Sequence, residues 1–567
     1  MHGDPDTTIF KTYEGDPVWL RIVQGSHEEQ HSFQVHGLRW RRYRGQLDSA
    51  VRNQQSLGIS EAYTFINQVP IGPGDHLYKL SGADDLWLGC WGLIRVLPRP
   101  IAGEPLELSR PEGEPWPLPA ESPAPAMERR FRVKAERQRL LYRSDIVDPY
   151  GLVYRLTGTK ELGGEWMPTG PSKGNVREPL ILWCREGERV VVELTNSIEL
   201  LPSESLEPEP HAPEVPVEKA DRPVSSHVSM HADLVRYQIR AADGANVGHN
   251  PVQTAQPGET KLYEWDTSRP TSEDSNEGEA LGPLLLQDMA DFRNHRHHGL
   301  VGALVVLPKD ATPFEVQPRR ARARSTAKAV WHGSRVTVVR KGEAPSNPAA
   351  EREEHMVLLM QDGLRLFMKG KGGNVGFPLP DPPNEEAGDA EKEDQGQKGF
   401  NYRTEPLGPV FDPQGNPYTR LRPDPATPVW HVPSGAEVRL HLVGACDKPR
   451  HHSFTIHGVT WREDRFEPPT GPVPWVSSES AVSCGTARTL AFKIPVHPGH
   501  KARDLAYRSG VLKWDVPQGL WGIIRVKSQA RDEVSAGAVT ISLLGAAAAS
   551  AVAAVSMFGQ RRRRKRK

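Results

Sequence analysis

The sequence has few cysteines, few aromatic residues and no excess of charge of either sign. Its four cysteines, Cys90, Cys184, Cys446 and Cys484, are widely separated among 567 residues, and no two form a CxxC pair. They therefore indicate neither a zinc motif nor a disulfide framework. Aromatic residues make up 7% of the chain, and 71 basic residues balance 71 acidic ones.

Common catalytic and nucleic-acid signatures are also missing. The last seven residues, RRRRKRK, are all basic, so the rest of the chain carries 64 basic and 71 acidic residues and shows no basic face for nucleic acid. The chain contains no G-x-S-x-G elbow, no glycine-rich phosphate loop before a helix and no H-E-x-x-H. Serine hydrolases, P-loop enzymes and H-E-x-x-H metalloproteases are therefore not indicated.

One long uncharged run lies near the C-terminus. Residues 534–560 carry no charge, which exceeds the roughly 20 residues needed to span a bilayer, and the basic residues 561–567 follow at once. This pattern predicts a single transmembrane helix in the cell membrane, with a cytoplasmic tail and residues 1–530 outside the cytoplasm. The alternative is an alanine-rich buried or disordered tail with a cluster like a nuclear-localisation signal.

The opening MHGDPDTTIFKTYEG has no apolar signal-peptide core. Export of the chain therefore requires that the true start lies upstream. Otherwise the export hypothesis is wrong.

Glycine and proline are abundant, with 51 and 52 residues, and short runs of alternating apolar and polar residues lie between them. Such runs are typical of the strands of a β-sandwich. We expect an all-β chain of three sandwich domains. The expected division is domain 1–98, proline-rich linker 99–130, domain 131–308, basic linker 309–329 and domain 330–527.

A repeat links the first and third domains. HSFQVHG at 31–37 returns as HSFTIHG at 452–458, each followed by a tryptophan, and both domains close on WGxIRV. The third domain opens with HMVLLMQDG, and nothing before Ile9 corresponds to it. The first domain is therefore expected to lack an opening strand.

The order of these elements resembles the cupredoxin domains of multicopper oxidases, particularly the large multi-domain bacterial ones. GERVVVELTN, SMHADLVRY, TAQPGETKLYEWD and HGLVGALVVLP carry the resemblance, which covers nearly all of residues 9–527. It implies Greek-key sandwiches, copper as cofactor, and transfer of electrons from a reduced substrate or metal ion to oxygen.

Strand geometry tests the ligands that the resemblance implies, because residues two apart in a strand share a face. The family pattern would give His31 to a blue copper, and Gln34 and His36 to an oxygen-reducing cluster. In the second copy the same places fall to His452, Thr455 and His457. Each copy has thus lost one cluster histidine, and neither glutamine nor threonine replaces an imidazole well on copper.

A blue copper also needs a thiolate, which the family supplies as H-C-H before the last strand. Cys90 has no flanking histidine, and the third domain has no cysteine at that place. We therefore do not expect blue copper in the first or third domain. The competing interpretation makes His31 and His452 partly buried imidazoles that pack on Trp40 and Trp461 and bond backbone carbonyls.

The second domain offers the better candidate metal site. His231 and Asp233 take the two H-x-H places, on one expected strand face with His227 and Ser229. His295, His297 and His298 follow Asp288 and Met289 near the last strand. Histidine with carboxylate suits copper, zinc, iron or manganese. The alternative is a loop, DFRNHRHH, that caps the sandwich or pairs with Asp291.

Two functions remain open. The first is a membrane-anchored oxidase of the multicopper type, whose partners are a reduced substrate and oxygen. The second is a non-catalytic, membrane-anchored cupredoxin-like protein that binds a metal or a partner.

Overall fold

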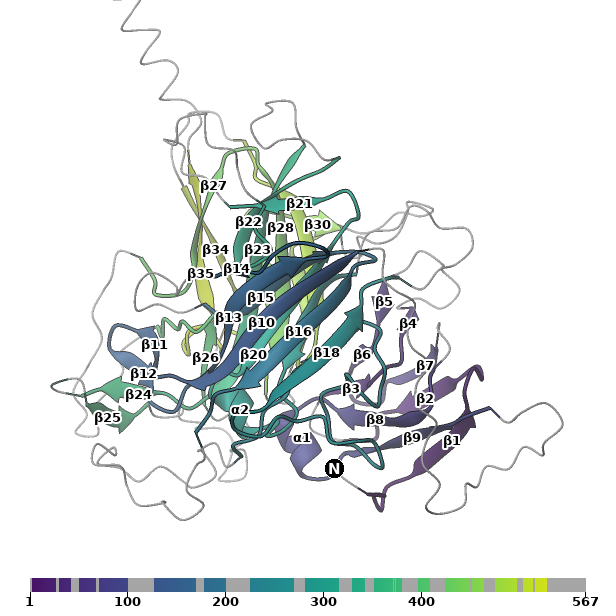
Figure 1. Ribbon diagram of the computed structural model, residues 1–567. Coiled ribbons are helices and arrows are strands. Elements are labelled where there is room, and N and C mark those ends of the chain that lie inside the picture. The colour runs from purple at the N-terminus through teal and green to yellow at the C-terminus, as the bar shows by residue number, and fades with distance from the viewer. Residues whose placement is uncertain are drawn as a thin grey trace, which may run out of the picture.

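The structure is a computed structural model, and strands dominate it (Figure 1). It describes residues 3–26, 30–41, 50–67, 71–99, 127–169, 178–199, 225–269, 281–315, 329–341, 351–370, 372, 374–379, 396–407, 424–447, 451–462, 475–496, 503–512 and 515–527. The all-β prediction is confirmed. The predicted membrane helix 534–560 and tail 561–567 lie outside these residues. Among the helices of the described residues, none is long and apolar enough to cross a membrane.

We call the sandwiches formed by the described residues of 3–99, 127–307 and 312–527 units one, two and three. Unit two, in blue and teal in Figure 1, shows the sandwich most fully. One sheet has the order β14-β13-β10-β16-β18, and the other has the order β15-β20-β19-β17. Each sheet contains one parallel pair, β10 with β16 and β15 with β20. The elements are β10 (Glu128–Arg137), β11 (Leu140–Arg143), β12 (Ile146–Asp148), β13 (Leu152–Glu161), β14 (Met167–Pro168), β15 (Leu180–Arg185), β16 (Arg189–Asn196), β17 (His231–Ala232), β18 (Thr260–Asp266), β19 (Gly282–Gln287), α2 (Asn294–His297) and β20 (Val301–Leu307).

Unit three, in green and yellow, repeats this plan with sheets β21-β22-β23-β28-β33 and β27-β35-β34-β29-β32. Its parallel pairs are β23 with β28 and β27 with β35. The elements are β21 (Thr312–Phe314), β22 (Arg335–Val339), β23 (Arg352–Leu364), β24 (Phe367–Lys369), β25 (Val375–Pro378), β26 (Gln397–Phe400), β27 (Val429–Pro433), β28 (Glu437–Ala445), β29 (His452–Ile456), β30 (Trp461–Arg462), β31 (Trp475–Val476), β32 (Ser478–Val482), β33 (Ala487–Lys493), β34 (Arg503–Ser509) and β35 (Trp521–Lys527).

Unit one, in purple, has one full sheet, β1-β9-β8-β3-β6, in which β1 runs parallel to β9. Its second sheet contains only β2 and β7 among the described residues. The elements are β1 (Ile9–Tyr13), β2 (Trp19–Val23), β3 (His31–Val35), β4 (Trp40–Arg41), β5 (Val51–Arg52), β6 (Gln54–Leu57), β7 (Ala62–Ile66), β8 (Gly74–Leu80), α1 (Ala83–Trp87) and β9 (Trp91–Leu97).

The units also share structure across their boundaries. Strand β21 lies in the segment that the sequence suggested as a linker and pairs with β22 of unit three. Strand β12 of unit two pairs with β24 of unit three, so one small sheet spans both.

Arg296 of α2 reaches all three units. Its guanidinium donates to the Ser81 carbonyl of unit one at 3.3 Å, to the Cys446 carbonyl of unit three at 2.6 Å, and to Gln287 of unit two.

Candidate metal centre between units one and two

The two H-x-H places that the sequence marked in units one and two face each other. Strand β3 directs Gln34 and His36 toward unit two, and the short strand β17 directs His231 and Asp233 toward unit one. The Gln34 amide donates to Oδ1 of Asp233 at 2.6 Å, and the rings of His36 and His231 stack with centroids 3.9 Å apart. All four residues are buried. The period-2 argument therefore selected the right faces of both segments.

Asp243 holds the two imidazoles from one side. Its Oδ1 lies 3.0 Å from Nδ1 of His36 and 3.2 Å from Nδ1 of His231, and its backbone carbonyl lies 2.7 Å from the same His231 nitrogen. In metal sites the non-ligating ring nitrogen usually donates to a carboxylate or a carbonyl, which fixes the tautomer. In both rings Nδ1 therefore contacts Asp243, and Nε2 lies on the far side of the ring from that contact.

Several polar atoms of this cluster are buried without hydrogen bonds. Within the described residues, no hydrogen bond reaches Nε2 of His36, Nε2 of His231, Oδ2 of Asp233, Oε1 of Gln34 or Nζ of Lys79. Nε2 of His231 lies 3.0 Å from Oδ1 of Asp233, an ion-pair contact when the ring is protonated. Because buried polar atoms are nearly always satisfied, such a concentration calls for a ligand or an ion.

The pKa values of the ionisable groups in the cluster are strongly shifted. Burial lowers the pKa of His36 to about 4, so this ring is neutral near pH 7. Burial also opposes the charged form of His231, but Asp233 and Asp243 raise the pKa of this ring to about 9. Burial and the nearby Arg296 lower the pKa of Lys79 to about 8. A cationic and a neutral imidazole therefore stack between two carboxylates.

The donor set fits a divalent first-row metal ion. Imidazole nitrogen is a borderline ligand and carboxylate and amide oxygens are hard ones, and a site of nitrogen and oxygen donors binds Cu²⁺ most tightly of the series. His36, His231 and Asp243 also bring possible ligand atoms within 4.8 Å of one another. However, stacked rings cannot aim both lone pairs at one point. Binding one ion through both Nε2 atoms therefore requires one ring to turn out of the stack.

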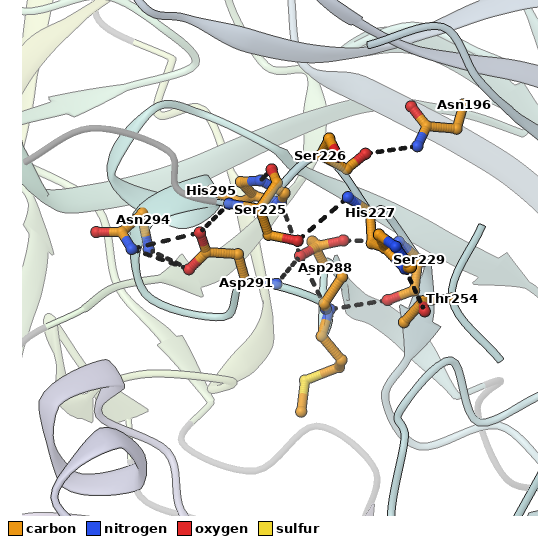
Figure 2. A network of polar contacts seen from close by, with 12 residues as sticks. Asn196, Ser225, Ser226, His227, Ser229, Thr254, Asp288, Asp291, Asn294 and His295 are labelled. Atoms are coloured by element: carbon orange, nitrogen blue, oxygen red, sulfur yellow. Dashed lines mark hydrogen bonds and ion pairs between the residues drawn. The ribbon is translucent and has the colours of Figure 1, made fainter. Parts of the chain in front are cut away.

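The other unit-two histidines do not converge on one point. DFRNHRHH forms the short helix α2, and each histidine faces its own aspartate. Figure 2 shows His295, whose Nδ1 lies 3.0 Å from Asp288 and whose Nε2 lies 2.9 Å from the Ser225 carbonyl. His297 contacts Asp447 of unit three at 2.6 Å, and His298 contacts Asp148 at 2.9 Å.

His227 is also separate from the cluster. Its Nδ1 lies 3.3 Å from the Thr254 hydroxyl (Figure 2). The long strand expected here is reduced to His231 and Ala232 of β17, so His227 lies outside the strand.

In unit three, His452 lies between two carboxylates. Its Nε2 contacts Asp362 at 2.7 Å and its Nδ1 contacts Asp515 at 2.6 Å, so a carboxylate lies beside each ring nitrogen. Burial opposes the charge, but the carboxylates raise the pKa of His452 well above its usual value. Cys446 completes a second buried group with Asp362 and His452, and burial raises the pKa of its thiol to about 11.

The remaining predicted positions are close to the surface. His31 lies 3.2 Å from Asp85 and is partly exposed, and His457 is exposed, with its Nε2 2.9 Å from Arg508. His31 and His452 were expected to bond backbone carbonyls; in the structure His31 contacts Asp85, and both ring nitrogens of His452 contact aspartates. Sequence reasoning also missed Asp243 and Lys79, because neither lies in a recognisable motif and only the fold brings them to the cluster.

Comparison with known proteins gives a structural resemblance only. No family model and no curated protein matches the chain. A multicopper oxidase structure is 16% identical, with 70% of this chain and 89% of the other covered and a TM-score of 0.36. The blue copper oxidase of Nitrosomonas europaea is 13% identical over 70% and 86%, with a TM-score of 0.35. The copper nitrite reductase of the same organism is 14% identical over 72% and 96%, with a TM-score of 0.36. These superpositions are too loose to assign a site or an activity to this chain, and the description of its fold rests on the strand order.

Proposed function

We propose that this protein is a multicopper-oxidase-like, copper-binding protein that holds the ion between units one and two, without the electron relay of an oxidase. His36 would supply an imidazole ligand through Nε2, and His231 would do the same once the ion displaces its Nε2 proton, with Asp233 and Gln34 as oxygen donors. Asp243 would orient both rings. The observation that carries the proposal is that Nε2 of both anchored imidazoles, Oδ2 of Asp233 and Oε1 of Gln34 are buried without a hydrogen bond among the described residues.

The non-catalytic alternative is favoured over the oxidase by the surroundings of the cysteines. An oxidase of this type needs a thiolate beside histidine ligands. Cys446 is the described cysteine that groups with a histidine, and that histidine, His452, has both nitrogens bonded to carboxylates. The described residues therefore offer no ready entry point for single electrons.

The test is copper loading of the full chain, followed by dialysis, metal analysis and electron paramagnetic resonance. We expect about one Cu²⁺ per chain, with nitrogen couplings and no intense thiolate charge-transfer band. His231→Ala should lose the ion. His249→Ala, at an exposed histidine outside the cluster, should keep it.

Two results would contradict the proposal. A folded protein that retains no copper, or equal retention by the His231→Ala variant, would remove this site. Oxygen uptake with a phenolic or metal-ion donor, together with a thiolate band, would instead support the oxidase.

A further inference from the structure

Two buried cationic side chains lie close together where units one and two join, and the proposed copper site uses neither of them. Lys79 of β8 is 1% exposed, and Arg296 of α2 is 4% exposed. Nζ of Lys79 lies 4.8 Å from the ring centroid of Phe292, and Cζ of Arg296 lies 3.9 Å from the same centroid. One aromatic ring therefore holds both cations. Two like charges at this depth need a negative charge nearby.

Each of the two cations also has a donor without an acceptor. Nη1 of Arg296 donates to the carbonyls of Ser81 and Cys446. Its Nη2 donates to Gln287, but its Nε–H has no acceptor in the part of the chain that the structure describes. The ammonium of Lys79, with three hydrogens, has none there either. Because buried donors are nearly always paired, these two point to an acceptor that carries negative charge.

The carboxylates nearest to the two cations face other groups. Asp233 lies 3.0 Å and Asp243 lies 3.2 Å from nitrogens of His231. Asp447 lies 2.6 Å from Nε2 of His297. Within the described residues, none of these three carboxylates accepts a hydrogen bond from either cation. The acceptor is therefore not supplied by the aspartates of the junction.

Counting charges gives the sign and size of the charge that is missing. Burial and, after it, the Arg296 charge lower the pKa of Lys79 to about 8, so its ammonium is charged at pH 7. Lys79, Arg296 and His231 then carry three positive charges, against two negative charges on Asp233 and Asp243. One positive charge is left over. A water molecule could accept from both donors, but it would not offset this charge.

We propose that Lys79 and Arg296 bind one small monovalent anion, of the size of nitrate, chloride or bicarbonate, between units one and two. The anion would accept charge-assisted hydrogen bonds from the ammonium and from Nε–H of the guanidinium. Gln287 connects this site to the copper site, because its Oε1 accepts from Arg296 and its Nε2 donates to Asp233 at 3.3 Å. Binding of the anion does not require copper, since neither cation is a ligand of the proposed ion.

Nitrate is the probe, and the full chain is used without copper and in chloride-free buffer. Equilibrium dialysis followed by ion chromatography of the denatured chain should give about one nitrate per chain. Lys79→Met removes the ammonium without leaving a donor unpaired, so this variant should fold and bind nitrate at least tenfold more weakly. Lys11→Met, at an exposed lysine of the same unit, should bind nitrate like the wild type.

Thermal melting gives a second measurement on the same proteins. A ligand that binds only the folded chain raises its melting temperature. Nitrate should therefore raise the melting temperature of the wild type and of Lys11→Met relative to that of Lys79→Met at the same salt concentration.

A folded wild-type chain that holds neither nitrate nor another monovalent anion would overturn the proposal in favour of bound water. Equal nitrate binding by wild type and Lys79→Met would overturn it too, as would an equal loss in Lys11→Met, which would trace binding to general charge. Copper loading of the same preparations is a separate readout. A chain that binds nitrate but no copper would remove the proposed function and leave the anion site standing.

Discussion

The two copies of the repeated motif have nearly the same sequence and opposite surroundings. In HSFQVHG the final histidine, His36, is fully buried and stacks on His231 of unit two. In HSFTIHG the final histidine, His457, is exposed beside Arg508. The first histidines differ in the reverse sense, since His31 has one partly exposed aspartate and His452 has two buried ones. The neighbouring unit, more than the motif, decides what each histidine can do.

Gly37 shows how the buried copy is held. It follows His36 with a φ of 77°, and a Cβ at this position would lie 2.9 Å from Nδ1 of His76. Glycine is therefore required both by the left-handed backbone and by the close approach of the His76 ring. Gly458 adopts a similar φ of 79° without such a close neighbour. The turn is common to both copies, and the tight packing against His76 of β8 belongs to the first copy alone.

The largest contrast is expected in stability. His452→Gln removes the imidazolium that lies between the buried Asp362 and Asp515 and leaves only the more distant Lys398 contact to Asp515, which should reduce the free energy of unfolding by about 3–5 kcal/mol. His31→Gln, at the matching position, removes the partly exposed contact with Asp85 and should cost at most about 1 kcal/mol. Urea denaturation of both variants measures this difference. Equal losses would mean that the two first histidines have the same role.

Metal affinity should separate the final histidines. His36→Ala removes an imidazole of the proposed site, and we expect copper affinity to fall by about 100-fold or more. His457→Ala, at the matching place in the exposed copy, should leave it unchanged. Competitive titration with a chelator measures both affinities. A comparable loss in His457→Ala would move the copper to unit three.

Asp243 should matter for copper without being required for folding of the individual units. Asp243→Asn keeps the shape but weakens the carboxylate contact to both Nδ1 atoms, so we expect a loss of copper affinity of about 10–100-fold. Asp515→Asn alters the equivalent partner of His452 and serves as the matched control. It should not change copper affinity, although it should lower stability. An affinity unchanged in Asp243→Asn would show that the aspartate does not orient the imidazoles.

The smallest expected effect concerns acid. The stabilising contribution of Asp515, which contacts His452 of the second copy, should be lost over a narrow pH range. Burial opposes ionisation of Asp515, but His452 lowers the pKa of this carboxyl to about 2. A carboxyl with a lowered pKa stabilises the fold above its unfolded pKa near 4 and loses that contribution as the pH falls through about 2. The stability difference between wild type and Asp515→Asn should therefore shrink by on the order of 2 kcal/mol between pH 4 and pH 2. A difference that grows on acidification would reverse the assigned sign.

Much of the fold could be inferred from local patterns. Alternating runs broken by glycine and proline identified strands, and the two-residue period placed Gln34 with His36 and His231 with Asp233 on the correct faces. The partners of the histidines could not be inferred in this way. Asp243, Asp447, Asp148, Asp362 and Asp515 reach the rings from distant segments. In addition, DFRNHRHH carries no periodicity that distinguishes a short helix from a loop.

The contacts of Arg296 bear on how the molecule unfolds. One guanidinium from unit two bonds carbonyls of units one and three, and it is 4% exposed. Separation of either outer sandwich would break one of these bonds and expose the guanidinium to water, and it would also loosen the opposite contact. The three sandwiches should therefore melt as one cooperative block, with a single calorimetric transition, despite their repeated architecture.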